Sequence, residues 1–121
     1  MSLTAEDLDL IAGVKEVVIE TRLGERAFGT VIWVAVDEGE VFVRSVRGRA
    51  GRWFQRALAD PKVTLRVGGT RFRFRAEPAT DDESVRRTSD GLSAKYPKGR
   101  SLDAMLHTDV LDTTLRLEPQ P

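Results

Sequence analysis

The sequence predicts a mainly β domain with short helices, in which six short strands form a small antiparallel barrel. Runs rich in β-branched and aromatic residues alternate with turn residues, and stretches with helical spacing are short. The predicted strands cover residues 17–19, 31–36, 41–43, 63–67, 70–76 and 113–117. Closure into a barrel is expected because it removes the exposed edges that an open sheet would leave. No repeat or linker divides the 121 residues, so we expect a single domain over residues 1–121.

Two glycine-containing turns indicate antiparallel hairpins. Residues 37–40 separate the second and third predicted strands, and Gly68-Gly69 separates the fourth and fifth. Glycine adopts the positive φ of such tight turns at little steric cost. Side chains of residues 70–76 alternate, with phenylalanines on one face and arginines on the other. This strand is therefore expected to have one core face and one cationic face.

Helical spacing is confined to segments with recognisable ends. The predicted helices cover residues 4–13, 52–60, 80–96 and 102–106. Thr4 is the expected cap of the first helix. The third begins with a capping-box pattern, in which Thr80 is the cap and Glu83 lies three residues later. We expect these helices to interrupt the barrel after the third strand and before the last.

The composition excludes several kinds of chemistry. The chain contains no cysteine, which excludes disulfides, thiolate zinc sites and cysteine nucleophiles, and His107 is its one imidazole. Its longest apolar run, residues 31–36, is far shorter than the roughly 20 residues of a membrane helix. The N-terminus lacks the basic-then-apolar order of a signal peptide. We therefore expect a cytoplasmic protein with no membrane attachment, no metal site and no His-dependent triad.

The formal net charge of zero conceals a strong segregation of charge. Residues 1–43 carry 3 basic and 9 acidic side chains, residues 44–75 carry 10 and 1, and residues 76–121 carry 6 and 9. The three segments have net charges of −6, +9 and −3. A local excess of this size is costly through self-repulsion unless it is solvated, paired or matched to an anion. Either the acidic flanks or a ligand must balance the middle segment.

The densest part of that segment, from Arg44 to Phe54, has the components of an anion site. Gly48 and Gly51 allow the backbone to approach a ligand closely, and the following helix start offers N–H groups without intrahelical partners. Arginine adds bidentate, charge-assisted hydrogen bonds, and Ser45 can donate another. We interpret the segment as a phosphate site. The same residues also fit a turn whose arginines are solvated or pair with the acidic flanks.

Further landmarks surround this loop: a Trp-bearing strand with Asp37 at its turn, a strand ending in Arg44-Ser45, the Gly/Arg loop itself, Trp53-Phe54, and Asp60-Pro61 before another strand. They extend over residues 32–69, about a third of the chain. With these landmarks the region resembles a known superfamily, the split β-barrel flavoproteins, which includes pyridoxamine phosphate oxidase and the deazaflavin-dependent nitroreductases. The whole chain resembles a small bacterial family of domains of unknown function within that superfamily. The fold implied is a six-stranded antiparallel split β-barrel of the FMN-binding type.

The resemblance further implies a homodimer with FMN or a deazaflavin bound in a cleft between protomers. The cofactor-binding positions carried over are Ile32, Trp33, Arg44, Ser45, Arg47, Arg49, Arg52 and Trp53. The serine and the arginines would contact the phosphate, and residues 31–33 would lie along the isoalloxazine ring. Trp33 fits either the core or a stacking wall. Some split-barrel proteins bind haem or no known ligand, and no substrate motif or proton donor accompanies the loop.

Three functions are compatible with these residues. The first is a flavin- or deazaflavin-dependent oxidoreductase of unknown substrate, in which the cofactor supplies the hydride chemistry. The second is a barrel that binds a ligand without catalysis. The third is a nucleic-acid-binding barrel that uses the arginine-rich residues 44–75 and their aromatic side chains. The inward-facing phenylalanines and the zero net charge argue against the third function.

Overall fold

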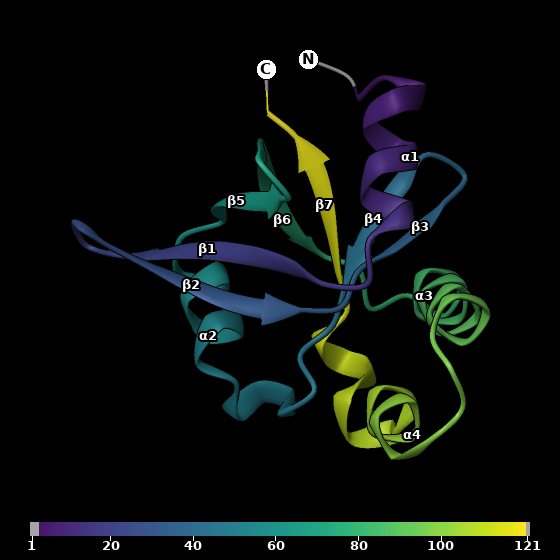
Figure 1. Cartoon of the computed structure of the whole chain (residues 1–121). Helices are drawn as coiled ribbons and strands as arrows, with labels where there is room; N and C mark the ends of the chain where they lie inside the picture. Colours follow the sequence, from purple (N-terminus) through teal and green to yellow (C-terminus); the bar gives the residue numbers. More distant parts are fainter. Residues whose placement is uncertain (1–2, 121) are drawn as a thin grey trace.

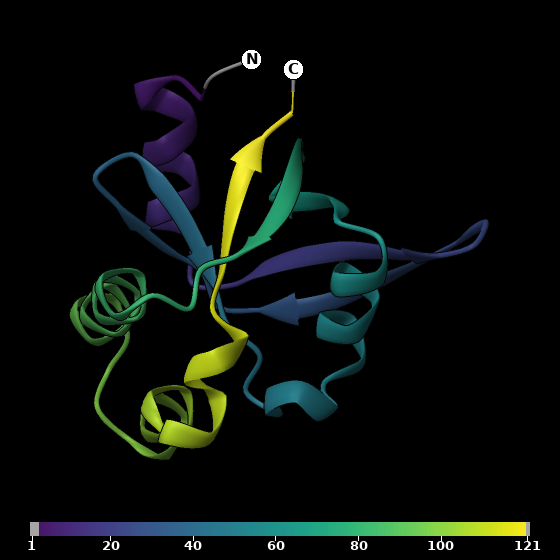
Figure 2. The same cartoon turned by 180° about the vertical axis from the view of Figure 1, so that it is seen from behind.

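Seven strands form one antiparallel sheet in the computed structural model of the protein, which describes residues 3–120 (Figure 1). The helices are α1 (Ala5–Gly13), α2 (Arg52–Ala59), α3 (Asp82–Lys95) and α4 (Arg100–Leu106), with 3-10 turns η1 (Gly48–Ala50) and η2 (Thr108–Thr113). The strands are β1 (Val17–Leu23), β2 (Arg26–Ile32), β3 (Ala35–Asp37), β4 (Glu40–Val43), β5 (Lys62–Val67), β6 (Thr70–Pro78) and β7 (Leu115–Pro119). Their order across the sheet is β2-β1-β5-β6-β7-β4-β3. The sheet curls into a half-barrel, so that β1 and β2 run across the direction of β7 and β4 (Figures 1 and 2).

The prediction of six strands is wrong because one apolar run contains two strand ends. Residues 31–36 are divided between β2, which ends at Ile32, and β3, which begins at Ala35. β2 pairs with β1 whereas β3 pairs with β4, so the chain changes partner strand at Trp33 and Val34. The Val34 N–H donates to the hydroxyl of Tyr96 (3.1 Å) rather than to a neighbouring strand. Apolar residues continue through this change, and therefore their spacing did not reveal it.

The two predicted hairpins are confirmed. β3 pairs with β4 around residues 38–39, and β5 pairs with β6 around Gly68-Gly69. Gly39 and Gly68 have φ of 80° and 61°, the region that favours glycine. The last strand begins at Leu115, two residues later than expected, because η2 occupies residues 108–113.

Helix starts agree with the sequence in one case and differ in another. Thr4 caps α1 in a capping box with Asp7, as expected. The cap of α3 is Asp81 rather than Thr80, and its carboxylate accepts from the N–H of Ser84 (3.0 Å). A charged acceptor makes the stronger cap, and this hydrogen bonding lowers the pKa of Asp81. None of the helices within residues 3–120 is long and apolar enough to cross a bilayer.

Two hydrophobic clusters hold the elements in place. The larger joins the strands to one side of α2 and includes Ile32, Trp53 and Phe54. The smaller lies beneath α3 and α4 and consists of Ala35, Leu92, Tyr96, Leu102 and Met105, with Trp33 packed against it. Residues of both clusters line one cavity together with residues of the connection from β4 to α2.

Candidate functional site

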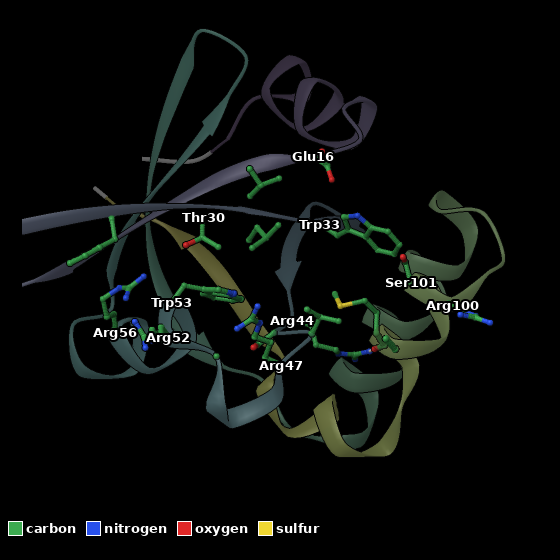
Figure 3. Close-up of a pocket in the computed structure, with 18 residues that line it drawn as sticks. Glu16, Thr30, Trp33, Arg44, Arg47, Arg52, Trp53, Arg56, Arg100 and Ser101 are labelled. Carbon is green, nitrogen blue, oxygen red and sulfur yellow. The ribbon is translucent and has the colours of Figure 1, made fainter.

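A cavity of about 810 Å³ opens where the two clusters meet, bounded by β2, the loop between β4 and α2, the start of α2, and α4 (Figure 3). Volumes of this size are typical of small-molecule and cofactor sites. Its lining consists of Glu16, Phe28, Thr30, Val31, Ile32, Trp33, Arg44, Ser45, Val46, Arg47, Gly51, Arg52, Trp53, Arg56, Arg100, Ser101, Ala104 and Met105.

Seven of the eight residues predicted to bind a cofactor line this cavity: Ile32, Trp33, Arg44, Ser45, Arg47, Arg52 and Trp53. Arg49 does not. Its guanidinium pairs with Asp112 (2.6 Å), and the residue borders a second, more open hollow near His107. The structure thus brings together the predicted residues from β2 and from the loop, and leaves Arg49 outside.

Two glycines determine the course of the loop. Gly48 has φ of +65°, and a Cβ at this position would lie 3.3 Å from the carbonyl oxygen of Asp109. A Cβ on Gly51 would collide with Oγ of Ser45. The Ser45 hydroxyl donates to the Gly48 carbonyl (2.8 Å), and the Ser45 N–H donates to Oγ1 of Thr113 (3.1 Å). The Ser45 hydroxyl therefore stabilises the loop from within.

The start of α2 is open to an anion. Gly51 is the N-cap, no side chain caps the helix, and its first turn contains no acidic residue. The first N–H groups of a helix lack intrahelical partners and carry partial positive charge. Arg52 is the first residue of this helix and lines the cavity. An anion at this end of the cavity would meet both the helix start and a guanidinium.

Sequence reasoning missed several lining residues. Arg56 lies one turn after Arg52, donates to Oγ1 of Thr21 (2.8 Å) and stacks over the ring of Phe28 (4.3 Å). Its spacing of four residues from Arg52 was a usable signal, because such residues share a helix face. The residues of α4 had no local signal, since α4 reaches the cavity only through tertiary packing. They are Arg100, Ser101, Ala104 and Met105.

Two tryptophan side chains line the cavity and are held in place by their packing. Trp33 is half-buried and stacks on Tyr96, with 3.9 Å between ring centroids and 3° between ring planes. The Tyr96 hydroxyl donates to the carbonyl of Lys15 (2.6 Å), and burial raises the pKa of Tyr96. Trp53 is 7% exposed and borders the cavity from α2. Trp33 therefore packs against the smaller core cluster and lines the cavity at once.

Arg44 is buried, with 1% of its surface exposed. Its guanidinium donates to Oγ1 of Thr114 (2.9 Å), Oγ of Ser89 (3.1 Å), and the carbonyls of Met105 (3.0 Å) and Val85 (3.1 Å). All four acceptors are neutral. Desolvation lowers the pKa of Arg44 to about 10, so the side chain remains charged at neutral pH. Most of its donors are thus bonded to protein oxygens.

Ion pairing distinguishes the arginines of the cavity from several arginines of the outer sheet face. On the outer sheet face, Arg66 and Arg71 share Glu20, and Arg75 pairs with Glu77. None of the arginines that line the cavity has a carboxylate oxygen within 4 Å among residues 3–120. These are Arg44, Arg47, Arg52, Arg56 and Arg100. In this part of the chain, carboxylates of the acidic flanks therefore balance several arginines outside the cavity, although not Arg73 of the sheet face, and none of those inside it.

Solved structures share this fold. A proposed pyridoxamine 5′-phosphate oxidase from Listeria innocua has a TM-score of 0.70 at 12% identity, over 96% of this chain and 92% of that one. An FAD-binding protein from Mesorhizobium loti has a TM-score of 0.71 at 13% identity, over 100% and 91%. HutZ, the heme storage protein from Vibrio cholerae, has a TM-score of 0.72 at 15% identity, over 100% and 92%. The fold is thus that of the split barrels related to pyridoxamine 5′-phosphate oxidase.

The chain belongs to the DUF2255 family, described as uncharacterized proteins conserved in bacteria, which it matches over residues 7–117. No curated protein matches the sequence. The predicted membership of a bacterial family of unknown function is therefore confirmed, and the predicted split-barrel fold is shared with these solved structures.

Proposed function

We propose that the protein binds a flavin-type cofactor, FMN or a deazaflavin, in this cavity, with the phosphate at Arg47, Arg52 and the start of α2. The observation that carries the proposal is the convergence of five arginines without carboxylate partners on one cavity. Arg44 is buried, whereas Arg47, Arg52 and Arg100 are exposed and Arg56 is half-buried, so these four guanidiniums are free to meet a ligand. A phosphate supplies a counter-charge with acceptor oxygens that match the guanidinium fork. The uncapped helix start favours the same end of the cavity for the phosphate.

The remaining walls suit a planar ring system. β2 contributes Ile32 and leads directly to Trp33, while Trp53 and Met105 come from α2 and α4. Apolar and aromatic walls with a few polar groups are typical of cofactor sites. When bound, a flavin would supply hydride chemistry, and the residues of this chain would orient it and limit water access. We therefore propose an oxidoreductase, with non-catalytic ligand binding as the alternative.

Several residues have a role here that differs from the one implied by the superfamily resemblance. Arg47 and Arg52 would contact the phosphate directly, and Arg56 would add charge at the same end. Ser45 would act by fixing the loop, since its hydroxyl already donates to Gly48. Arg49 would take no part, because it pairs with a carboxylate outside the cavity.

Haem is a second cofactor to weigh, because HutZ has the same fold. Haem iron takes axial ligands such as His, Cys, Met or Tyr. The cavity lining contains no His, Cys or Tyr, and its Met105 is 4% exposed. His107 lies at the second hollow instead. The donor set thus favours a phosphate-bearing flavin over haem.

We also propose that a second copy of the chain completes the cavity as a homodimer. Val31 and Val46 line the cavity yet are 58% and 52% exposed. β2, which carries Val31, is an edge of the sheet. Exposed apolar residues beside a pocket are typical of interaction sites, and twofold symmetry is the commonest way to cover them.

Nucleic-acid binding has weaker support. Three arginines of the outer sheet face are already paired with Glu20 and Glu77. Phe74 is buried and Phe72 is partly buried against the core, so neither provides an exposed stacking platform on that face. Affinity for DNA or RNA that falls steeply with salt concentration would favour this alternative.

The test is an absorbance spectrum of the purified protein, followed by titration with FMN and a deazaflavin while fluorescence and thermal stability are monitored. We expect a bound chromophore, or stabilisation by several degrees at low micromolar ligand; ligand at 100 times Kd stabilises by about 2.7 kcal/mol. Arg52→Ala should weaken FMN binding without lowering the melting temperature of the ligand-free protein. The matched control is Arg75→Ala on the outer sheet face. Failure of both ligands to shift the wild type at high concentration would refute the proposal.

A further inference from the structure

We propose that Arg44 is a positioning residue that couples phosphate binding to the position of α4 against the loop between β4 and α2. Arg44 would thereby favour phosphorylated flavins without contacting the phosphate. The inference rests on the proposed function and concerns the regulation of the same site. It differs from the role implied by the superfamily resemblance, in which this arginine is a phosphate contact.

Arg44 lies at a junction of four elements. It follows the last residue of β4 and precedes the arginine-rich loop. Its guanidinium donates to Val85 and Ser89 of α3, to Met105 of α4, and to Thr114 just before β7. One buried side chain therefore connects the base of the loop with both helices that cover this end of the sheet.

The connection to α4 is important because α4 forms one wall of the cavity. α4 packs mainly against α3 and η2. The hydrogen bond from Arg44 to the Met105 carbonyl is the one hydrogen bond in the described structure that joins residues 44–56 to α4. The last turn of α4 contains no basic residue, so the guanidinium supplies the positive charge that the carbonyl end of a helix favours. Loss of Arg44 should therefore loosen α4 relative to the loop.

The charge of Arg44 acts over a longer range than its hydrogen bonds. All its acceptors are neutral, and a phosphate in the cavity would be a counter-charge for it. At an effective dielectric constant of about 20, two unit charges about 8 Å apart still change an affinity roughly 30-fold. A ligand with a phosphate gains this attraction and a ligand without one does not. A bound phosphate that stabilises Arg44 in its hydrogen-bonded position also stabilises, by linkage, the position of α4 in which the Met105 carbonyl accepts from Arg44.

The experiment compares FMN with riboflavin, which has the same ring and no phosphate, in wild type, Arg44→Met, Arg44→Lys and Arg75→Met. Arg75→Met makes the same change at an exposed arginine outside the cavity. Kd values come from flavin fluorescence, and amide hydrogen exchange of residues 100–106 is followed with and without FMN.

We expect Arg44→Met to lose FMN affinity tenfold or more, with riboflavin affinity changed by less than threefold, and to exchange α4 amides faster than wild type. Arg44→Lys should keep part of the FMN preference, because it keeps the charge, while α4 still exchanges faster. An unchanged ratio of FMN to riboflavin affinity in Arg44→Met, or unchanged α4 exchange, would overturn the inference. If wild type binds neither flavin, the proposed function fails, and α4 exchange in the ligand-free variants still tests the positioning role. If Arg44→Met does not fold, the comparison of Arg44→Lys with wild type decides.

Discussion

One methyl group added at Gly51 should displace the loop between β4 and α2 and destabilise the protein. The backbone of Gly51, with φ −61° and ψ 126°, is accessible to any residue, so Gly51→Ala introduces no backbone strain. The obstacle is steric, because the new Cβ would overlap Oγ of Ser45 and lie 3.3 Å from the carbonyl oxygen of Gly48. The Ser45 hydroxyl is buried and donates to that same carbonyl. To admit the methyl group, the hydroxyl must move and its hydrogen bond must break.

The magnitude follows from these contacts. A lost intramolecular hydrogen bond costs about 1 kcal/mol, and a buried hydroxyl without a partner raises this toward ~2 kcal/mol. Replacing glycine by alanine at a helix N-cap adds roughly 0.5 kcal/mol. We therefore expect the free energy of unfolding to fall by about 2 kcal/mol, which for a domain of this size lowers the melting temperature by roughly 6–12 °C. FMN affinity should fall as well, because the displaced loop presents Arg47 and the helix start differently.

Urea and thermal unfolding measure the loss, and Gly69→Ala is the matched control. A Cβ on Gly69 would meet no atom within 4 Å, and its φ lies outside the positive range, so that variant should stay within about 0.5 kcal/mol of wild type. In a Ser45→Ala background the obstructing oxygen is absent, and Gly51→Ala should then cost much less. Equal stability of Gly51→Ala and Gly69→Ala would refute the reasoning, because it would mean that the loop does not hold Ser45 in place.

Three further variants test other parts of the structure. Gly48→Ala forces a residue with a side chain into φ +65° and should cost about 1–2 kcal/mol, measured by urea unfolding. Lys95→Met tests a half-buried amine: partial burial lowers the pKa of Lys95 from 10.5 to about 8, so the unfolded chain holds the proton more tightly. Wild-type stability should therefore rise relative to the variant as the pH increases from 8 to 10.5, and parallel curves in a thermal-unfolding series would contradict this. Val31→Glu places a charge at the exposed cavity rim and should turn the proposed dimer into a monomer in sedimentation analysis; an unchanged mass would place the interface elsewhere.

Local signals predicted the elements whose ends are marked by turn residues. The β3–β4 and β5–β6 hairpins follow from glycines at positions that need positive φ, and Thr4 follows from the capping pattern. The division of residues 31–36 into two strands could not be predicted in this way. It depends on which strands pair with β2 and β3, and on the hydroxyl of Tyr96 that receives the Val34 N–H. Such partners lie far away in the sequence, and the periodicity of apolar residues within one segment does not identify them.

In the candidate site too, residues that are neighbours along the chain could be predicted, and the contacts between distant segments could not. Most predicted residues line the cavity because they are contiguous along the β4–α2 connection, which the Gly/Arg pattern marks. The direction of each side chain did not follow from that pattern. Arg49 turns outward to Asp112, and Arg44 turns into the protein, because acceptors from α3, α4 and the start of β7 meet there. Only the tertiary arrangement brings those acceptors together.

The distribution of ion pairs is more informative about function than the count of charges. The charge of the +9 segment alone does not distinguish a nucleic-acid surface, a solvated face and a phosphate site, because each tolerates clustered arginine. In the described part of the fold, Arg66, Arg71 and Arg75 are paired on the sheet face, where Arg73 is not, and Arg47, Arg52 and Arg56 are unpaired around the cavity. Paired charges on an open face have already been compensated and contribute little to attracting a partner. Unpaired guanidiniums around a concave, partly apolar site have no carboxylate to displace before they bind an anion, and this difference favours a small phosphate-bearing ligand over a long polyanion.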